Sequence, residues 1–248
     1  MSNENLIYVL NKKLALYQAP DGFRTSMDSV MLAASCPAKS SQKVLDLGCG
    51  VGSAGLCVLK RIDEASLTGV EIQENQVEIA NKNASENSMN DKAEFICSDI
   101  RELKLGNVFD HVICNPPYMK AGAHVHSPSQ SKAQAMGHVD EGMDLKDWIA
   151  CAHRHIKGQG SLTIIHDAGN SDNIIHALYG KSGNKKFGNI EIFPLYPKQG
   201  VSAKRVVIRA WKHKKSPAIL HQGIIMHDEN GDYTKAANKI LRDAEKLF

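Results

Sequence analysis

Short apolar runs alternate along the chain with longer segments whose apolar residues recur at helical spacing. Five runs rich in β-branched and other apolar residues predict buried strands, at 44–47, 66–70, 93–97, 109–114 and 161–166. Helices are predicted before, between and after them, at 27–36, 54–60, 76–87, 145–156 and 171–180. Strands that alternate with helices are typical of a parallel sheet, so the pattern predicts an α/β fold.

The two ends of the chain depart from this alternation. Residues 6–19 predict a short hairpin or extended arm, whereas 190–194 and 203–211 predict the last two strands of the sheet. Residues 217–233 predict a further extended piece, followed by a final helix over 235–247. We therefore divide the chain into an N-terminal arm with the first helix (1–39), a central domain (40–215) and a C-terminal extension of that same domain (216–248).

Composition bounds the class of protein. The 248 residues are 42% hydrophobic and 23% charged, which is ordinary for a soluble globular chain. No run of about eighteen apolar residues predicts a membrane span, and the polar start does not resemble a secretory signal. We therefore expect a cytoplasmic protein with no membrane partner. The six cysteines form no Cys-x-x-Cys pair and are predicted to be reduced core residues, and the scattered histidines predict no metal site.

A glycine-rich turn joins the first predicted sheet strand to the helix that follows it. Its spacing is Asp-x-Gly-x-Gly-x-Gly, with Asp46, Gly48, Gly50 and Gly52. Glycines let the backbone approach a ligand closely, and the helix N-terminus behind them offers free N–H groups, so the turn predicts a cradle for a nucleotide-like ligand. A carboxylate at Asp46 repels the pyrophosphate of a dinucleotide but suits the cationic methionine end of S-adenosylmethionine.

Acidic residues follow the next two predicted strands. Glu71 lies about twenty residues after the glycine turn, where one carboxylate can accept from both hydroxyls of a ribose. Asp99 is placed to accept from an adenine amino group, and the neighbouring Ile100 is predicted to lie on the adenine ring. Because parallel strands end at one edge of a sheet, we expect these residues to form one site with Asp46.

The fourth strand runs into Asn115-Pro116-Pro117-Tyr118. Proline cannot donate a ladder hydrogen bond, so the two prolines end the strand abruptly. Asn115 and a backbone carbonyl can accept from the NH2 of a planar amide or amidine, while Tyr118 stacks on its face. Taken alone, the tetrapeptide is equally well explained as a Pro-Pro turn beside a surface tyrosine. The cofactor residues on the neighbouring strands favour a substrate site.

The net charge of +3 is modest, but its distribution is uneven. Residues 195–215 contain seven basic residues and no acid: Lys198, Lys204, Arg205, Arg209, Lys212, Lys214 and Lys215. Such a segment suits a phosphate backbone, and a solvated strand end explains it equally well. Residues 120–142 are rich in Gly, Ser, His, Gln and Ala, and their length predicts a substrate loop.

With these residues the chain resembles the class I S-adenosylmethionine-dependent methyltransferases, of the branch that carries Asn-Pro-Pro-Tyr. The resemblance covers residues 40–211. It implies a Rossmann-like, seven-stranded, mostly parallel sheet with a reversed last strand and helices on both faces. It also implies site roles: Asp46, Gly48, Gly50, Glu71 and Asp99 bind the cofactor, Asn115, Pro116 and Tyr118 are catalytic, and Pro117 binds substrate.

Two flanking segments narrow the resemblance. Residues 21–32 are similar to the segment ahead of the glycine turn in bacterial valine-tRNA adenine-N6-methyltransferases, and 198–206 are similar to their basic tail strand. In that family the target is the adenine just 3′ of the anticodon. The resemblance therefore implies a tRNA partner, with Arg24 near the carboxylate of the cofactor and Lys204 and Arg205 near RNA.

Three alternatives remain open from the sequence. The same tetrapeptide suits methylation of a glutamine amide in a protein, which the basic segment disfavours. It also suits another nucleic-acid nitrogen, such as the N2 amine of an rRNA guanine or the amine of a DNA adenine. The non-enzymatic alternative is a catalytically idle RNA-binding module, and the presence of both the glycine turn and the complete tetrapeptide disfavours it.

Overall fold

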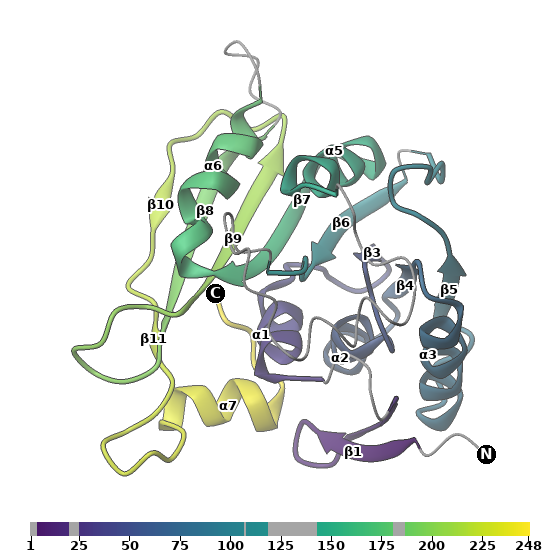
Figure 1. The fold of residues 1–248 in the computed structure, drawn as a ribbon, viewed down its shortest axis with the longest axis horizontal. Coiled ribbons are helices and arrows are strands. Elements are labelled where there is room, and N and C mark those ends of the chain that lie inside the picture. The colour runs from purple at the N-terminus through teal and green to yellow at the C-terminus, as the bar shows by residue number, and fades with distance from the viewer. Residues whose placement is uncertain (1–3, 20–24, 107, 119–142, 181–186) are drawn as a thin grey trace, which may run out of the picture.

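The computed structural model describes residues 4–19, 25–106, 108–118, 143–180 and 187–248 (Figure 1). The strands of its main sheet are β3 (Lys43–Leu47), β4 (Ser66–Glu71), β5 (Ala93–Cys97), β6 (Phe109–Cys114), β7 (Ile156–Asp167), β8 (Phe187–Tyr196), β9 (Arg205–Lys212), β10 (Ile219–Leu220) and β11 (Ile224–Ile225). The helices are α1 (Met27–Ser35), α2 (Ser53–Arg61), α3 (Glu74–Glu86), α5 (Leu145–His155), α6 (Ser171–Tyr179) and α7 (Lys235–Asp243). These elements confirm the predicted α/β alternation.

The main sheet has the order β10-β8-β9-β7-β6-β3-β4-β5, and β11 also pairs with β8. Strands β7, β6, β3, β4 and β5 are parallel, whereas β9 lies antiparallel to both β7 and β8. A short turn joins β8 to β9, and such a turn can join only antiparallel neighbours. The predicted seven-stranded sheet with a reversed last strand is confirmed. The C-terminal extension enlarges it to nine strands, because β10 and β11 each add a short parallel pairing to β8.

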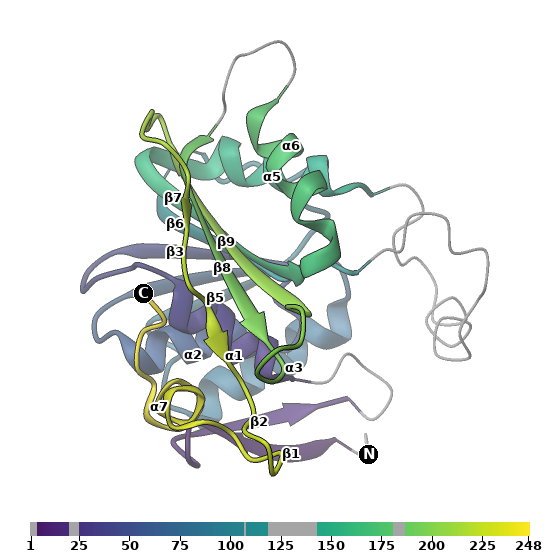
Figure 2. The same cartoon turned by 90° about the vertical axis from the view of Figure 1, so that its left-hand side faces the viewer.

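Successive side chains along the strands divide the core between the two faces of the sheet. Val44 and Val207 point to the face on which α1, α2, α3 and α7 pack. Their chain neighbours, Leu45 and Ile208, point to the opposite face, on which α5 and α6 pack. This period of two is expected of strands buried on both sides. The helices therefore lie on both faces, as Figure 2 shows.

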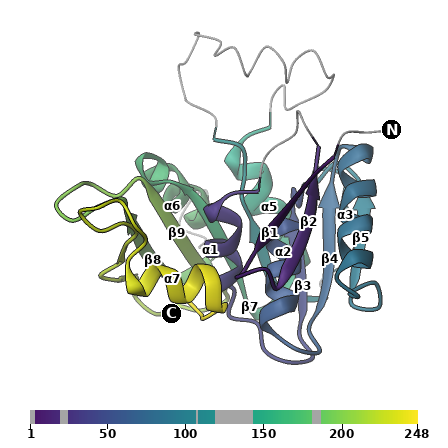
Figure 3. The same ribbon diagram turned by 90° about the horizontal axis from the view of Figure 1, so that it is seen from below.

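A separate hairpin, formed by β1 (Asn5–Val9) and β2 (Leu14–Gln18), confirms the predicted N-terminal arm. Two asparagines hold it against α3 (Figure 3). Oδ1 of Asn83 accepts from the backbone N–H of Tyr17 at 2.6 Å, and its Nδ2 donates to the Tyr17 carbonyl at 3.1 Å. Asn87 makes the same two bonds with the backbone of Ala15. The side chains therefore satisfy the edge of β2 as a further strand would.

Two predicted boundaries are wrong. Strand β7 begins at Ile156, ahead of a Gly-Gln-Gly segment that resembles a break. A β-carbon at Gly160 would lie 2.3 Å from the carbonyl oxygen of Asp110, so this glycine allows two strands to approach and does not end one. Helix α7 ends at Asp243, because Ala244 adopts the left-handed conformation with φ of 64°.

Within the ranges that the structure describes, no helix is long and apolar enough to cross a bilayer. The same residues include no group of three or more His, Cys, Asp or Glu side chains that could hold a metal ion. Five of the six free cysteines are buried, as predicted. Cys97 is the exception, because it lies at the end of the edge strand β5 and is exposed.

Candidate active site

The predicted cofactor and substrate residues meet at one edge of the main sheet. Leu47 on β3 pairs with Val70 on β4 and with Cys114 on β6. The residues that follow these three positions are the glycine turn, Glu71 and Asn115. They therefore lie together at the carboxyl edge of the sheet, which is where open parallel sheets bind ligands.

The glycine turn requires glycine for two different reasons. Gly48 has φ of 64°, and a β-carbon there would lie 2.5 Å from the Trp148 ring on α5. Gly50 has φ of 53°, and a β-carbon there would meet nothing within 4 Å. Gly48 thus lets the turn pack on α5, whereas Gly50 leaves open space in which a ligand can approach the backbone.

Two buried carboxyl groups accept hydrogen bonds from the backbone of the glycine turn and of the helix that follows it. Asp46 is 2% exposed, and its Oδ2 accepts from the Gly55 N–H in the first turn of α2 at 3.0 Å. Burial is the main cause that raises the pKa of Asp46 to about 7; the hydrogen bond from Gly55 lowers it and the nearby charge of Glu71 raises it. Oε2 of Glu71 accepts from the Gly50 N–H at 3.0 Å. The turn is therefore fixed by the same acids that were predicted to bind the cofactor.

Asp99 follows β5 and is paired with Arg101. Its carboxylate accepts from the Arg101 backbone N–H at 2.8 Å and from Nε at 2.9 and 3.1 Å. The Arg101 side chain holds the pKa of Asp99 below its usual range, so the group is a carboxylate. An adenine amino group would therefore share Asp99 with Arg101, a partner that no sequence pattern indicated.

One apolar side chain at this edge, Ile72, is exposed. Ile100, predicted to lie on an adenine ring, is only 4% exposed and packs in the core with Val70 and Leu103. Ile72 is 39% exposed and directly follows Glu71. Ile100 therefore offers little exposed surface to an adenine ring, whereas Ile72 is exposed and carries a comparable sequence signal, an apolar residue directly after an acid at a strand end.

The side chain of Asn115 carries an acceptor, Oδ1, that has no partner among the described residues. Its Oδ1 is shielded from solvent and accepts no hydrogen bond within the part of the chain that the structure describes. Buried polar atoms are nearly always paired, because an unpaired one costs roughly 1–3 kcal/mol. Pro116 beside it is buried and Pro117 is exposed. The strand end therefore carries an amide oxygen whose capacity to accept a hydrogen bond is unused among the described residues.

Tyr118 lies among side chains from three other elements. Its hydroxyl donates to Oδ2 of Asp28 on α1 at 3.0 Å. Its ring centroid lies 4.7 Å from that of His166 on β7 and 4.7 Å from Cζ of Arg205 on β9. Burial and the Asp28 carboxylate raise the pKa of Tyr118, so the hydroxyl stays protonated. The ring is still partly exposed.

The predicted basic patch is partly internal. Arg209 is 8% exposed and pairs with Glu191 through Nε at 2.7 Å and Nη2 at 2.8 Å. Lys212 is 6% exposed and donates to the carbonyls of His153 and Ile156 at 2.8 and 2.7 Å. These two cations are committed to the fold and do not contribute to a surface for phosphate.

The remaining basic residues are divided between the two ends of β9. Lys198 and Lys204 precede the strand, near the carboxyl edge, and both are exposed. Lys214 and Lys215 follow its other end. Arg205 forms ion pairs with Asp28 and Asp167 and is not a free cation. The interpretation of the segment as one continuous basic patch is therefore wrong, because it ignored the length and direction of β9.

Comparison with known proteins gives the family. Residues 24–185, well over half of the chain, match the family described as "Methyltransferase small domain". The chain belongs to this methyltransferase family. A tRNA1(Val) (adenine(37)-N6)-methyltransferase of Shewanella baltica (strain OS185) is 26% identical to it over 228 residues, or 90% of this chain and 92% of the relative. A protein of the same name from Vibrio campbellii is 29% identical over 129 residues, which is 52% of this chain and 53% of that relative.

Solved structures give the fold of this methyltransferase. A crystal structure of a predicted O-methyltransferase from Agrobacterium tumefaciens superposes with a TM-score of 0.72. It is 23% identical in sequence, and the match covers 89% of this methyltransferase and 98% of the other chain. The class I, Rossmann-like architecture predicted from the sequence is therefore confirmed.

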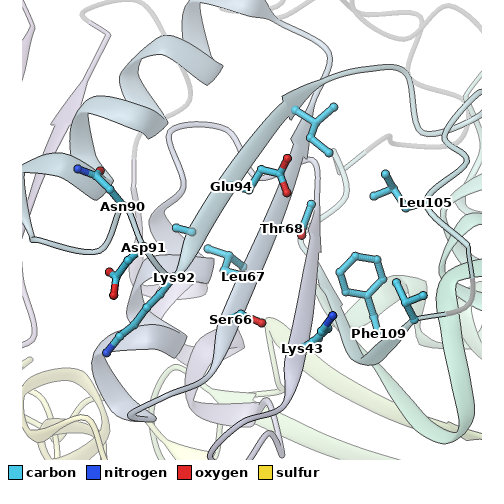
Figure 4. A pocket seen from close by; sticks show the side chains of 13 residues that line it. Lys43, Ser66, Leu67, Thr68, Asn90, Asp91, Lys92, Glu94, Leu105 and Phe109 are labelled. Atoms are coloured by element: carbon cyan, nitrogen blue, oxygen red, sulfur yellow. The ribbon is translucent and has the colours of Figure 1, made fainter.

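A cavity of about 430 Å³ lies away from the edge that carries the predicted site of this methyltransferase. Its lining includes Lys43, Ser66 and Phe109, which begin β3, β4 and β6 (Figure 4). It therefore opens toward the amino ends of strands whose carboxyl ends carry the predicted residues. Arg24 and the predicted substrate loop at 120–142 lie outside the described residues.

Proposed function

We propose that this methyltransferase transfers the methyl group of S-adenosylmethionine to the exocyclic amine of an adenine in RNA, and that this RNA is a tRNA. The observation that carries the proposal is the buried Oδ1 of Asn115, which accepts no hydrogen bond from the described residues and lies at the edge that also holds the glycine turn. An exocyclic amine is the donor that this acceptor lacks. The named relatives, which act on adenine 37 of a tRNA, favour the same substrate for this chain. An RNA substrate of this kind also favours a cytoplasmic location.

The residues at the carboxyl edge fit the cofactor. Gly50 opens onto free space, and the acids Asp46 and Glu71 are suited to the cationic methionine end and the ribose hydroxyls. Asp99 is suited to the adenine amino group, and Ile72 offers the apolar surface for the ring. The narrower resemblance adds Arg24 for the carboxylate of the cofactor.

S-adenosylmethionine supplies an electrophilic methyl carbon on a sulfonium. The adenine nitrogen is a weak nucleophile, because its lone pair is delocalised into the ring. Oδ1 of Asn115 and the carbonyl of Pro116 would accept its two N–H bonds and favour a tetrahedral nitrogen directed at the methyl carbon. The cofactor would supply the methyl group to this nitrogen, its sulfur would keep the electron pair of the S–C bond, and the amine would lose one proton. Tyr118 would hold the base by stacking.

On this proposal the affinity for S-adenosylmethionine depends on pH through Asp46. The pKa of this buried carboxyl is about 7, so it is neutral below that pH and anionic above it. A cation binds the anionic form, so affinity should fall by up to about tenfold per pH unit below 7 and level off above it. Calorimetry across this range should also show proton release at acidic pH. Asp46→Asn should bind more weakly with a flat profile, and an unchanged slope in that variant would exclude Asp46 as the source.

The substrate is tested by tritiated methyl transfer into total tRNA and into total protein from the same cells. We expect counts in the tRNA pool that ribonuclease removes and protease does not. Label only in protein would favour glutamine-amide methylation, for which Asn115 is equally suited. Label in neither pool, from protein that binds S-adenosylmethionine, would contradict the proposed function and favour an idle RNA-binding module.

A further inference from the structure

Tyr118 is held by two charged side chains that lie far from it in the sequence. Oδ2 of Asp28 accepts from the Tyr118 hydroxyl at 3.0 Å and from Nε of Arg205 at 3.1 Å. The Arg205 guanidinium also lies over the Tyr118 ring, with Cζ 4.7 Å from the ring centroid. The three side chains therefore form a closed set of contacts in which one carboxylate oxygen binds both the hydroxyl and the guanidinium.

The support for this arrangement is rigid. Asp28 is 6% exposed and lies in the first turn of α1, where the Ser26 side chain accepts from its backbone N–H. Arg205 is the first residue of β9, and its Nη1 also lies 3.5 Å from Oδ2 of Asp167 on β7. Helix α1 and strand β9 belong to the packed body of the molecule, so the position of Tyr118 is set by elements outside the tetrapeptide.

We propose that Asp28 and Arg205 are positioning residues that fix the ring of Tyr118 for the target base, and that Arg205 serves the reaction in this way rather than by binding phosphate. The inference rests on the proposed function. A stacking ring acts best when its orientation is fixed before substrate arrives, because less conformational freedom is then lost on binding. Arg205 is paired, whereas Lys198 and Lys204 at this end of β9 are exposed and form no ion pair with the residues that the structure describes.

A double-mutant cycle tests whether Asp28 acts through Tyr118. The variants are Asp28→Ala, Tyr118→Leu and the pair, assayed for kcat/KM on whichever pool, tRNA or protein, the wild type methylates. Asp28→Ala alone should lower kcat/KM by about tenfold to a hundredfold, as expected for a displaced binding group. In the Tyr118→Leu background the same change should cost less than about twofold, because the group it positions is already gone. Cofactor affinity should stay within about twofold in all variants, since these residues lie on the substrate side.

Arg205→Met is taken through the same cycle, so that the inference is still tested if Asp28→Ala does not fold. Asp63→Ala, at an exposed aspartate, is the matched control and should match the wild type. An equal loss in both Tyr118 backgrounds, or wild-type activity in Asp28→Ala, would overturn the inference. The cycle is assayed on whichever substrate, tRNA or protein, the wild type methylates. If the wild type methylates only protein, the proposed RNA substrate is refuted, but the cycle still tests whether Asp28 and Arg205 act through Tyr118. If the wild type methylates neither tRNA nor protein, both the proposed function and the positioning role are refuted.

Discussion

Replacing Asn115 with alanine should lower the rate of methyl transfer by about a hundredfold to a thousandfold. This is the range seen when one prepositioned polar group is removed from an active site. The reason is that Oδ1 of Asn115 is buried just after β6 and accepts no hydrogen bond in the part of the chain that the structure describes. It is therefore available to accept from the target amine, and alanine removes the acceptor. The rate is measured as single-turnover transfer at saturating cofactor and substrate.

The same variant should bind S-adenosylmethionine almost as the wild type does. Asn115 makes no contact with the glycine turn or with Glu71 in the hydrogen bonds that the structure describes, so calorimetry should give an affinity within about twofold. Asn173→Ala, at an exposed asparagine on α6, controls for loss of an amide elsewhere. Loss of cofactor binding in Asn115→Ala would refute the division between a cofactor side and a substrate side.

Replacing Arg209 with methionine should lower the free energy of unfolding by about 3–5 kcal/mol, because removing one partner leaves the other as an uncompensated buried charge. Glu191 is 8% exposed and loses two bonds from Arg209, keeping the Trp211 Nε1 donor at 3.0 Å. The Arg209 guanidinium also lies 4.1 Å from the centroid of the Phe248 ring, so the change loosens the C-terminus as well. Urea unfolding followed by circular dichroism measures the effect.

Lys214→Met is the matched control for Arg209→Met. Lys214 belongs to the same basic segment but is more exposed and lies over the face of Trp211, 3.8 Å from its centroid, so its loss should cost less than about 1 kcal/mol. If Arg209→Met instead kept full stability and weakened RNA binding, the original interpretation of the segment as a phosphate-binding patch would be restored.

The periodicity of the sequence predicted the strands and the edge at which the site lies. Glu71 and Asn115 could be placed because each comes at the end of an apolar run, and Asp46 because it lies in the run that leads into the glycine turn. Parallel strands bring such ends together. Local patterns in the sequence thus predicted most of the fold and the residues that meet at this edge of the sheet.

The errors concern contacts between segments far apart in the chain. The roles of Arg205 and Arg209 depend on the partners Asp28 and Glu191, and no local pattern in the sequence identifies those partners. Ile72 and Ile100 are the same residue type, and only the packing of the folded chain makes the first exposed and the second buried. Propensity and spacing describe a side chain's own segment, whereas burial and pairing depend on the whole fold.

The central claim is that the edge holding Asn115 methylates the exocyclic amine of an RNA adenine. The most direct test is to incubate unmodified tRNA with the enzyme and S-adenosylmethionine, digest the RNA to nucleosides and identify the product by mass spectrometry. The account predicts N6-methyladenosine with the wild type and none with Asn115→Ala. N2-methylguanosine, or methylated glutamine from a parallel protein digest with no modified nucleoside, would contradict it.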